Sequence, residues 1–148
     1  PIARQALRDR APLTAGQKVA INGAGGGAGS FALQFARTIG AEVTGIDHVD
    51  KQEFLHEHGA DHAIDYELID FTRIGGPYDL VVDFVANRTL RAAARAIAPG
   101  GTYVVVGGTL GAIFQAVAFG RFLPLPGRRR YGLLIAGPNK YLLSPIHL

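Results

Sequence analysis

The sequence contains no cysteine, and this absence removes several classes of function. Disulfide bonds, thiolate metal sites and cysteine nucleophiles are excluded, and a reducing, cytoplasmic compartment is the default expectation. Long apolar runs are also missing. The longest run, residues 112–120, is interrupted by Gln115 and falls far below the ~20 apolar residues that a membrane-spanning helix needs. We therefore expect no membrane partner.

Charged residues are scarce as well, at 18% of the 148 residues, and they are unevenly distributed. All acidic residues lie before residue 121, whereas residues 121–148 contribute only basic ones. A basic face of the kind that binds nucleic acid is missing, so we expect no nucleic-acid partner. The abundant residues are apolar ones, at 48%, and glycine, with 20 residues, which together favour one globular domain with many turns.

Short apolar runs alternate with helical patterns along the chain. This alternation predicts an α/β fold, a doubly wound parallel sheet with helices on both faces, known as the Rossmann fold. The clearest helix has apolar residues at three- and four-residue steps, including Ala28, Phe31 and Ile39, and ends at Gly40. The expected strands are residues 18–22, 42–46, 62–65, 79–83, 102–106 and 131–135, in the spatial order 3-2-1-4-5-6.

A second helix is expected after the fourth strand. Asn87 would be its N-cap, Leu90 would lie on its buried face, and Arg88, Arg91 and Arg95 would face solvent. Residues 107–130 give no clear pattern because repeated glycines and prolines interrupt any helix there.

The most informative segment is a glycine-rich turn between the first strand and the clearest helix. Its spacing, Gly23-x-x-Gly26-x-x-Gly29, lets the backbone approach a pyrophosphate at a helix N-terminus, and Gly29 permits close packing of the helix on the strand. Asp47 ends the second strand, where a carboxylate can accept hydrogen bonds from both hydroxyl groups of an adenosine ribose. These features predict a dinucleotide site. The alternative is a flexible turn, with Asp47 capping the next helix.

Three histidines have spacings that resemble those of metal ligands: His56, His58 and His62. A two-residue step on a helix directs side chains to opposite sides, and Gly59 separates the third histidine from the helix. We expect no metal site. No arrangement of serine, histidine and aspartate supports a catalytic group, so the catalytic residues stay unknown.

Four segments together resemble the cofactor-binding domain of the medium-chain dehydrogenase/reductase superfamily. They are residues 16–29, 59–66, 78–83 and 100–102, and the resemblance covers about residues 5–108 closely. Within the superfamily the chain is most similar to zinc-independent, quinone-oxidoreductase-like members, whose turn has alanine at the position of Ala24. The resemblance implies an NAD(P)-dependent oxidoreductase that transfers hydride to or from a small carbonyl, enone or quinone.

The resemblance also implies how the chain is organised. Residues 1–148 would form one dinucleotide-binding domain cut from a longer chain, with the domain for the small-molecule substrate absent. The isolated domain is then expected to be inactive and to bind no zinc. We further expect residues 131–135 to form an exposed sheet edge that pairs with a second copy in a homodimer, because the run is apolar and carries no charge inside it.

Three turns are implied by the resemblance to contact the cofactor. The matching residues are Gly26, Gly27 and Ala28 at the pyrophosphate, Val85 and Ala86 beside the cofactor ribose, and Gly107 and Gly108 near the nicotinamide.

The choice between NAD and NADP depends on the residues around the second strand. NADPH-using relatives bind the 2′-phosphate with a lysine and a tyrosine whose spacing Lys51 and Tyr66 match. Asp47 instead resembles the acidic residue of NAD-dependent alcohol dehydrogenases. Repulsion between a carboxylate and a 2′-phosphate ~4 Å apart would cost about 1 to 4 kcal/mol. NAD is therefore slightly favoured, and NADP stays open.

Two other functions use a similar turn. One is a non-catalytic dinucleotide-sensing module. The other is an S-adenosylmethionine-dependent methyltransferase, which also has a glycine-rich first turn and an acidic residue after its second strand, although its glycines usually come earlier relative to the strand. Fold analogy alone does not name a substrate.

Overall fold

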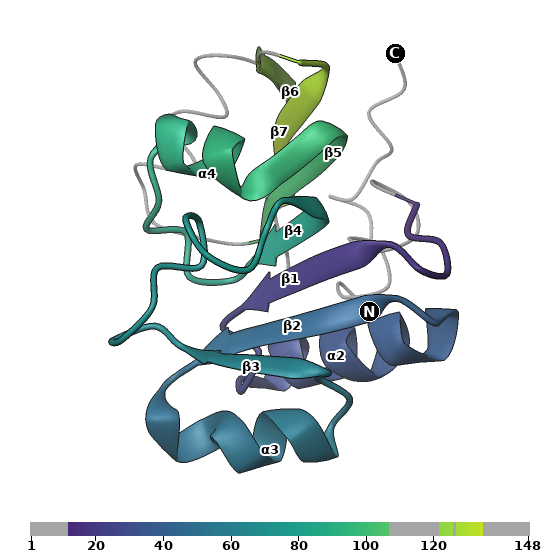
Figure 1. The fold of residues 1–148 in the computed structure, drawn as a ribbon, viewed down its shortest axis with the longest axis vertical. Helices are drawn as coiled ribbons and strands as arrows, with labels where there is room; N and C mark the ends of the chain where they lie inside the picture. Colours follow the sequence, from purple (N-terminus) through teal and green to yellow (C-terminus); the bar gives the residue numbers. More distant parts are fainter. Residues whose placement is uncertain (1–11, 107–121, 126, 135–148) are drawn as a thin grey trace, which may run out of the picture.

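The computed structural model describes residues 12–106, 122–125 and 127–134, and a twisted sheet forms its centre (Figure 1). Within these ranges the sheet has seven strands, in the order β3-β2-β1-β4-β5-β7-β6. Neighbouring strands are parallel except β6 and β7, which pair antiparallel at one edge. The strands are β1 (Lys18–Asn22), β2 (Glu42–Asp47), β3 (His62–Asp65), β4 (Tyr78–Asp83), β5 (Ile97–Val106), β6 (Phe122–Leu125) and β7 (Arg129–Leu134).

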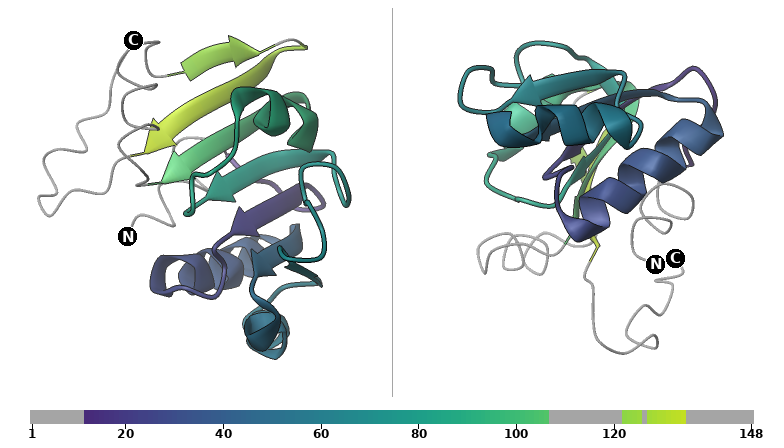
Figure 2. Two further views of the ribbon diagram at one scale, coloured as in Figure 1. Left: turned by 90° about the vertical axis from the view of Figure 1, so that its left-hand side faces the viewer. Right: turned by 90° about the horizontal axis from the view of Figure 1, so that it is seen from below.

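Helices cover both faces of the sheet, as a doubly wound fold requires. On one face Leu33 and Leu55, from α2 and α3, pack with Ile21 and Val43 of β1 and β2. On the other face Ala93 of α4 packs with residues of β1, β4 and β5. The left view of Figure 2 shows α4 in front of β4 and β5. The helices are α2 (Gly27–Ile39), the 3-10 turn η2 (Val49–Lys51), α3 (Gln52–Glu57) and α4 (Leu90–Ala96).

The expected strands and their order are confirmed, with β7 as the sixth strand. The expectation that residues 131–135 form an exposed sheet edge is wrong for the described residues of that strand. Residues 131–134 are not a free sheet edge, because β7 pairs with β5 on one side and with β6 on the other. The sequence did not indicate β6, which is short and contains Pro124. The free edge was the reason to expect a homodimer through this strand. Without it, pairing between copies of the chain stays an untested prediction.

The buried face of α2 differs in part from the expected one. Phe31 is 64% exposed, whereas Leu33 is fully buried. The residues facing the sheet are Gly29, Ala32, Leu33 and Ala36, spaced at helical steps. Three of these four are small, so the helix axis can approach β1 closely. Contact with the sheet therefore selects this stripe instead of the larger Phe31.

The start of α4 also differs from the prediction. Thr89, not Asn87, is the N-cap, and its hydroxyl accepts a hydrogen bond from the backbone N–H of Ala92. This later start turns Ala92, Ala93 and Ala96 toward the core in place of Leu90. It also leaves Arg88 ahead of the helix, and the predicted solvent-facing position of this residue is wrong.

None of the helices in the described ranges is long and apolar enough to cross a membrane.

Candidate functional site

A cavity of about 380 Å³ lies at the carboxyl ends of the central strands. In the sheet, β1 has β2 as its neighbour on one side and β4 on the other, so the strand order reverses between β1 and β4. Ligands of open α/β sheets bind at such a switch point. Four residues predicted from the sequence line it, together with others that were not predicted. The lining residues are Asn22, Gly23, Ile46, Asp47, Tyr66, Val85, Asn87 and Arg88.

The glycine turn links β1 to the N-terminus of α2. The backbone N–H groups of Gly23 and Ala24 donate to the carbonyl oxygen of Ile46, at 3.0 and 3.2 Å, which ties the turn to β2. Gly23 has a φ of 80°, a conformation that glycine adopts without strain. Gly26 is the N-cap of α2 and makes no side-chain capping bond, and the first turn of the helix contains no acidic residue. The helix end is thus suited to a negatively charged group.

The glycines of the turn have different surroundings. A Cβ at Gly29 would overlap the carbonyl oxygen of Gly23 and lie 2.7 Å from the Cα of Ala24, so Gly29 is needed for packing of α2. At Gly26 the nearest atom would be 3.5 Å away, and at Gly27 no atom lies within 4 Å. Those two positions are open on the side where a ligand would approach. Ala28 follows in the first turn of α2 and is half-buried.

Asp47 is the last residue of β2 and is fixed by backbone contacts. Its Oδ2 accepts from the N–H of Gly25 at 2.8 Å, and its Oδ1 accepts from the N–H of His48 at 2.7 Å. The side-chain amide of Gln52 donates to the carbonyl oxygens of Asp47 and His48, at 3.4 and 3.2 Å. These contacts hold the carboxylate beside the glycine turn, where the sequence placed it.

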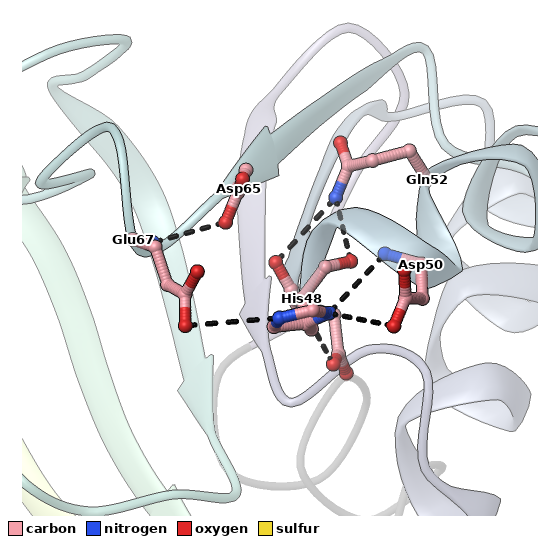
Figure 3. Close-up of polar contacts among 6 residues, drawn as sticks. His48, Asp50, Gln52, Asp65 and Glu67 are labelled. Carbon is pink, nitrogen blue, oxygen red and sulfur yellow. Dashed lines mark hydrogen bonds and ion pairs between the residues drawn. The ribbon is translucent and has the colours of Figure 1, made fainter.

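His48 lies between two carboxylates next to Asp47. Figure 3 shows its ring with Asp50 on one side and Glu67 on the other. The distances are 3.2 Å from Nδ1 to Asp50 and 3.7 Å from Nε2 to Glu67. The backbone N–H of Glu67 donates to Asp65 Oδ1 at 3.0 Å. Of these acidic residues and Asp47, only Asp47 is a lining residue of the cavity.

Lys51 and Tyr66, which were predicted to share a role, are placed differently. Tyr66 follows β3, is 48% exposed and lines the cavity. Lys51 ends η2 and is not among the lining residues. Its Nζ donates to the carbonyl oxygen of Gly25 at 3.3 Å. Gly107 and Gly108, the predicted contacts near the nicotinamide, lie outside the described residues.

The opposite wall of the cavity is the turn that follows β4, which we call the β4 turn. The buried carboxylate of Asp83 fixes its conformation. Asp83 is 0% exposed. Its Oδ1 accepts from Asn22 Nδ2 at 3.0 Å and from the N–H groups of Val85 and Ala86, both at 2.9 Å. Ala86 has a φ of 61°, which is unusual for a residue with a side chain. The two N–H bonds to Asp83 stabilise that conformation.

Tyr103 completes the surroundings of Asp83 from β5. Its hydroxyl donates to Asp83 Oδ2 at 2.5 Å, and its ring stacks on Tyr131 of β7 with 5.5 Å between centroids. Burial and then the Asp83 charge raise the pKa of Tyr103. The phenol therefore keeps its proton and remains a donor. Sequence analysis missed this network because it joins three strands far apart in the chain.

Arg88 is the basic residue that lines the cavity, and the sequence placed it in solvent. Its side chain is 23% exposed, its Nη1 lies 3.5 Å from Asp70 Oδ1, and its guanidinium carbon lies 5.2 Å from the centre of the Phe71 ring. The hydrogen bond from the Thr72 hydroxyl is the main contact that lowers the pKa of Asp70, and the charge of Arg88 lowers this pKa further. Asp70 is therefore kept ionised. Within the described part of the chain, Arg88 Nε has no hydrogen-bond acceptor.

The three histidines considered as metal ligands each bond to a separate oxygen. His56 and His58 contact the carbonyl oxygens of Ala60 and Phe54, and His62 contacts Glu42. No group of three or more histidine or acidic side chains that could hold a metal ion occurs in residues 12–106, 122–125 or 127–134.

Comparisons with known proteins agree with this architecture. Residues 27–141 match the model of the zinc-binding dehydrogenase family. A zinc-type alcohol dehydrogenase-like protein of Schizosaccharomyces pombe is 35% identical over 99 residues, which cover 64% of this chain and 28% of the relative. A pikromycin polyketide synthase component of Streptomyces venezuelae is 33% identical over 143 residues, which cover 91% of this chain and 4% of the relative.

A solved structure extends the similarity over nearly the whole chain. The quinone oxidoreductase from Coxiella burnetii aligns with a TM-score of 0.75 and 28% identity, covering 96% of this chain and 43% of that one. The chain thus spans less than half the length of these relatives. The family match covers most of the sequence, and the sheet order, the glycine turn and the acidic residue at the end of β2 agree with it. The chain belongs to the zinc-binding dehydrogenase family, and its fold is that of the cofactor-binding domain of the medium-chain dehydrogenase/reductase superfamily.

Proposed function

We propose that the chain binds a nicotinamide dinucleotide, with the adenosine half in the cavity between the glycine turn and the β4 turn. It would be the cofactor domain of an oxidoreductase that transfers hydride to or from a small carbonyl, enone or quinone. The observation that carries the proposal is the position of the cavity, which lies at the switch point of the sheet and beside an uncapped helix N-terminus.

The glycine turn suits the pyrophosphate. The space over Gly26 and Gly27 admits phosphate oxygens close to the backbone, and a side chain at either position would fill it. The free N–H groups and the dipole of α2, a helix of 13 residues, favour negative charge there. Ala28 would add its backbone N–H from the first turn of the helix.

The cavity suits an adenosine. Asp47 keeps acceptor capacity for the ribose hydroxyl groups beyond the two N–H bonds it already makes, since a carboxylate has about four acceptor sites. Tyr66 and Val85 supply apolar surface on opposite walls. Arg88 presents a flat cation backed by Phe71, a surface on which an aromatic base can stack.

The charges favour NAD over NADP. A 2′-phosphate would approach Asp47, the acidic residue that lines the cavity. Its negative charge would be repelled by this carboxylate, whereas the ribose hydroxyl of NAD is a hydrogen-bond donor to Asp47.

The bound nicotinamide supplies the hydride chemistry. This chain's residues bind and orient the dinucleotide, and none of the described side chains is assigned as a general acid or base. Positioning the substrate and excluding water require surfaces beyond the cavity described above. The isolated chain is therefore expected to bind cofactor without turning over substrate.

Calorimetric titration with NADH, NADPH and S-adenosylmethionine tests the proposal. We expect binding of NADH, weaker binding of NADPH and no heat with S-adenosylmethionine. Gly26→Val should abolish NADH binding and leave the fold intact, because only the carbonyl oxygen of Gly23, at 3.5 Å, lies near the new Cβ. Gln34→Val, on the exposed face of the same helix, is the matched control and should bind normally.

The alternatives give different results. Binding of S-adenosylmethionine alone would support a methyltransferase and overturn the oxidoreductase function. A full-length protein that binds NADH but reduces no quinone, enone or aldehyde would instead support a dinucleotide-sensing module.

A further inference from the structure

The side chain of Lys51 lies across the glycine turn at Gly25. A Cβ at Gly25 would overlap Lys51 Cδ and would lie 2.8 Å from Asp47 Oδ2. A side chain at this position would displace the Lys51 chain and press on the Asp47 carboxylate, because these two side chains, from η2 and the end of β2, occupy the space. The sequence pattern did not single out Gly25.

The peptide groups on both sides of Gly25 are held by those same side chains. The N–H of Gly25 donates to Asp47 Oδ2 at 2.8 Å, and the carbonyl oxygen of Gly25 accepts from Lys51 Nζ at 3.3 Å. Gly25 directly precedes Gly26, the N-cap of α2. The orientation of the Gly25 carbonyl also sets that of the Gly26 N–H, because the two belong to one planar peptide unit.

Lys51 contacts the glycine turn and is not a lining residue of the cavity. Asp47, Tyr66 and Arg88 line the cavity, and Lys51 does not. Its ammonium group is already bonded to the turn. The resemblance to NADPH-using relatives assigned Lys51 to the phosphate from spacing alone, and spacing does not show where a long side chain lies.

We propose that Lys51 is a positioning residue for the glycine turn, so that it supports binding of NADH and NADPH equally and does not select between them. The inference rests on the proposed function, because the turn matters only if it holds a pyrophosphate. The second contact, from Asp47, restrains the same turn from the other side. Loss of the lysine donor would loosen the turn without opening the cavity.

Lys51→Met tests this role, because methionine keeps an apolar chain over Gly25 and removes the donor. Adenosine, ADP, NADH and NADPH serve as probes. We expect the affinities for ADP, NADH and NADPH to fall by the same factor, roughly three- to tenfold, as for one hydrogen bond of ordinary strength. The affinity for adenosine, which lacks the pyrophosphate, should not change. Lys51→Arg should restore binding of all three phosphorylated probes.

Lys18→Met is the matched control, since Lys18 is an exposed lysine at the opposite end of β1. It should change none of the affinities. A loss confined to NADPH in Lys51→Met would overturn the proposal and assign Lys51 to the 2′-phosphate. Unchanged affinity for every probe would overturn it as well.

Amide hydrogen exchange gives a readout that needs no ligand and separates positioning from simple charge attraction. In Lys51→Met the amides of Gly25 and Gly26 should exchange faster, while that of Val104 in β5 should keep its rate and the urea midpoint should not move. Unchanged exchange at Gly25 would contradict the positioning role. If the unaltered chain bound no ADP, the proposed function would fail, and the exchange rates would still decide whether Lys51 restrains the turn.

Discussion

Two turns face each other across the cavity, and their side-chain contacts differ. The glycine turn has backbone bonds from Gly23 and Ala24 to β2, and its side-chain contacts come from the half-buried Asp47 and the exposed Lys51. The β4 turn is fixed by Asp83, which is 0% exposed and accepts four hydrogen bonds. Contacts at the surface are worth little to stability, whereas a buried carboxylate that loses its partners is costly.

The difference indicates a division of tasks. The β4 turn is part of the folded core and should be a rigid wall. The glycine turn can adjust to a ligand at small cost to the fold. Changes at the β4 turn should therefore act mainly on stability, and changes at the glycine turn mainly on binding.

The largest effect is expected from Asp83→Ala. The change leaves the amide of Asn22, the hydroxyl of Tyr103 and the N–H groups of Val85 and Ala86 without their acceptor. The free energy of unfolding should fall by about 3 to 5 kcal/mol, measured by urea denaturation.

Asp79→Ala is the control for this change, because Asp79 lies at the other end of β4 and accepts one bond, from the N–H of Lys18. Its loss should cost about 1 kcal/mol. Equal losses for the two variants would show that the β4 turn has no special rigidity.

A smaller effect is expected from Asp47→Ser, at the glycine turn. The ratio of NADPH affinity to NADH affinity should rise roughly tenfold, because repulsion of the 2′-phosphate falls and the ribose loses its acceptor. The urea midpoint should move little. Asp61→Ser, which alters a carboxylate bonded to Val43 near the other end of β2, should leave the affinity ratio unchanged. If the ratio of NADPH affinity to NADH affinity were unchanged in Asp47→Ser, Asp47 would not select the cofactor.

The smallest effect concerns alkaline pH. Burial raises the pKa values of Tyr78, Tyr103 and Tyr131. In the unfolded chain these phenols ionise near pH ~10, whereas in the folded chain they keep their protons, so the unfolded state binds fewer protons above that pH. Stability should be constant below about pH 9 and should decrease as the pH rises past about 10. The decrease should be shallower in Tyr103→Phe, and an identical slope in that variant would contradict the assignment.

The sequence predicted the backbone of the site better than its side chains. Strand order, the glycine turn and the place of Asp47 follow from local patterns, since apolar periodicity and glycine spacing reflect backbone geometry directly. Arg88 was misplaced because its position depends on contacts with Asp70 and Phe71, which no local period shows. The predicted role of Lys51 at a 2′-phosphate stays a prediction, because spacing does not show whether its flexible chain reaches the cavity or the turn. The strand β6 carries too short a pattern, with a proline inside, to be recognised.

The central claim, that a dinucleotide lies between the two turns, is tested most directly by NMR titration of the backbone amides with NADH. We expect the largest shift changes at Gly23 and Val85, which line the cavity, and at Gly26, the N-cap of α2. The shallow groove between α2 and α3, lined by Arg37 and His58, should show none. Shift changes confined to that groove, or absent from both turns at saturating NADH, would contradict the account.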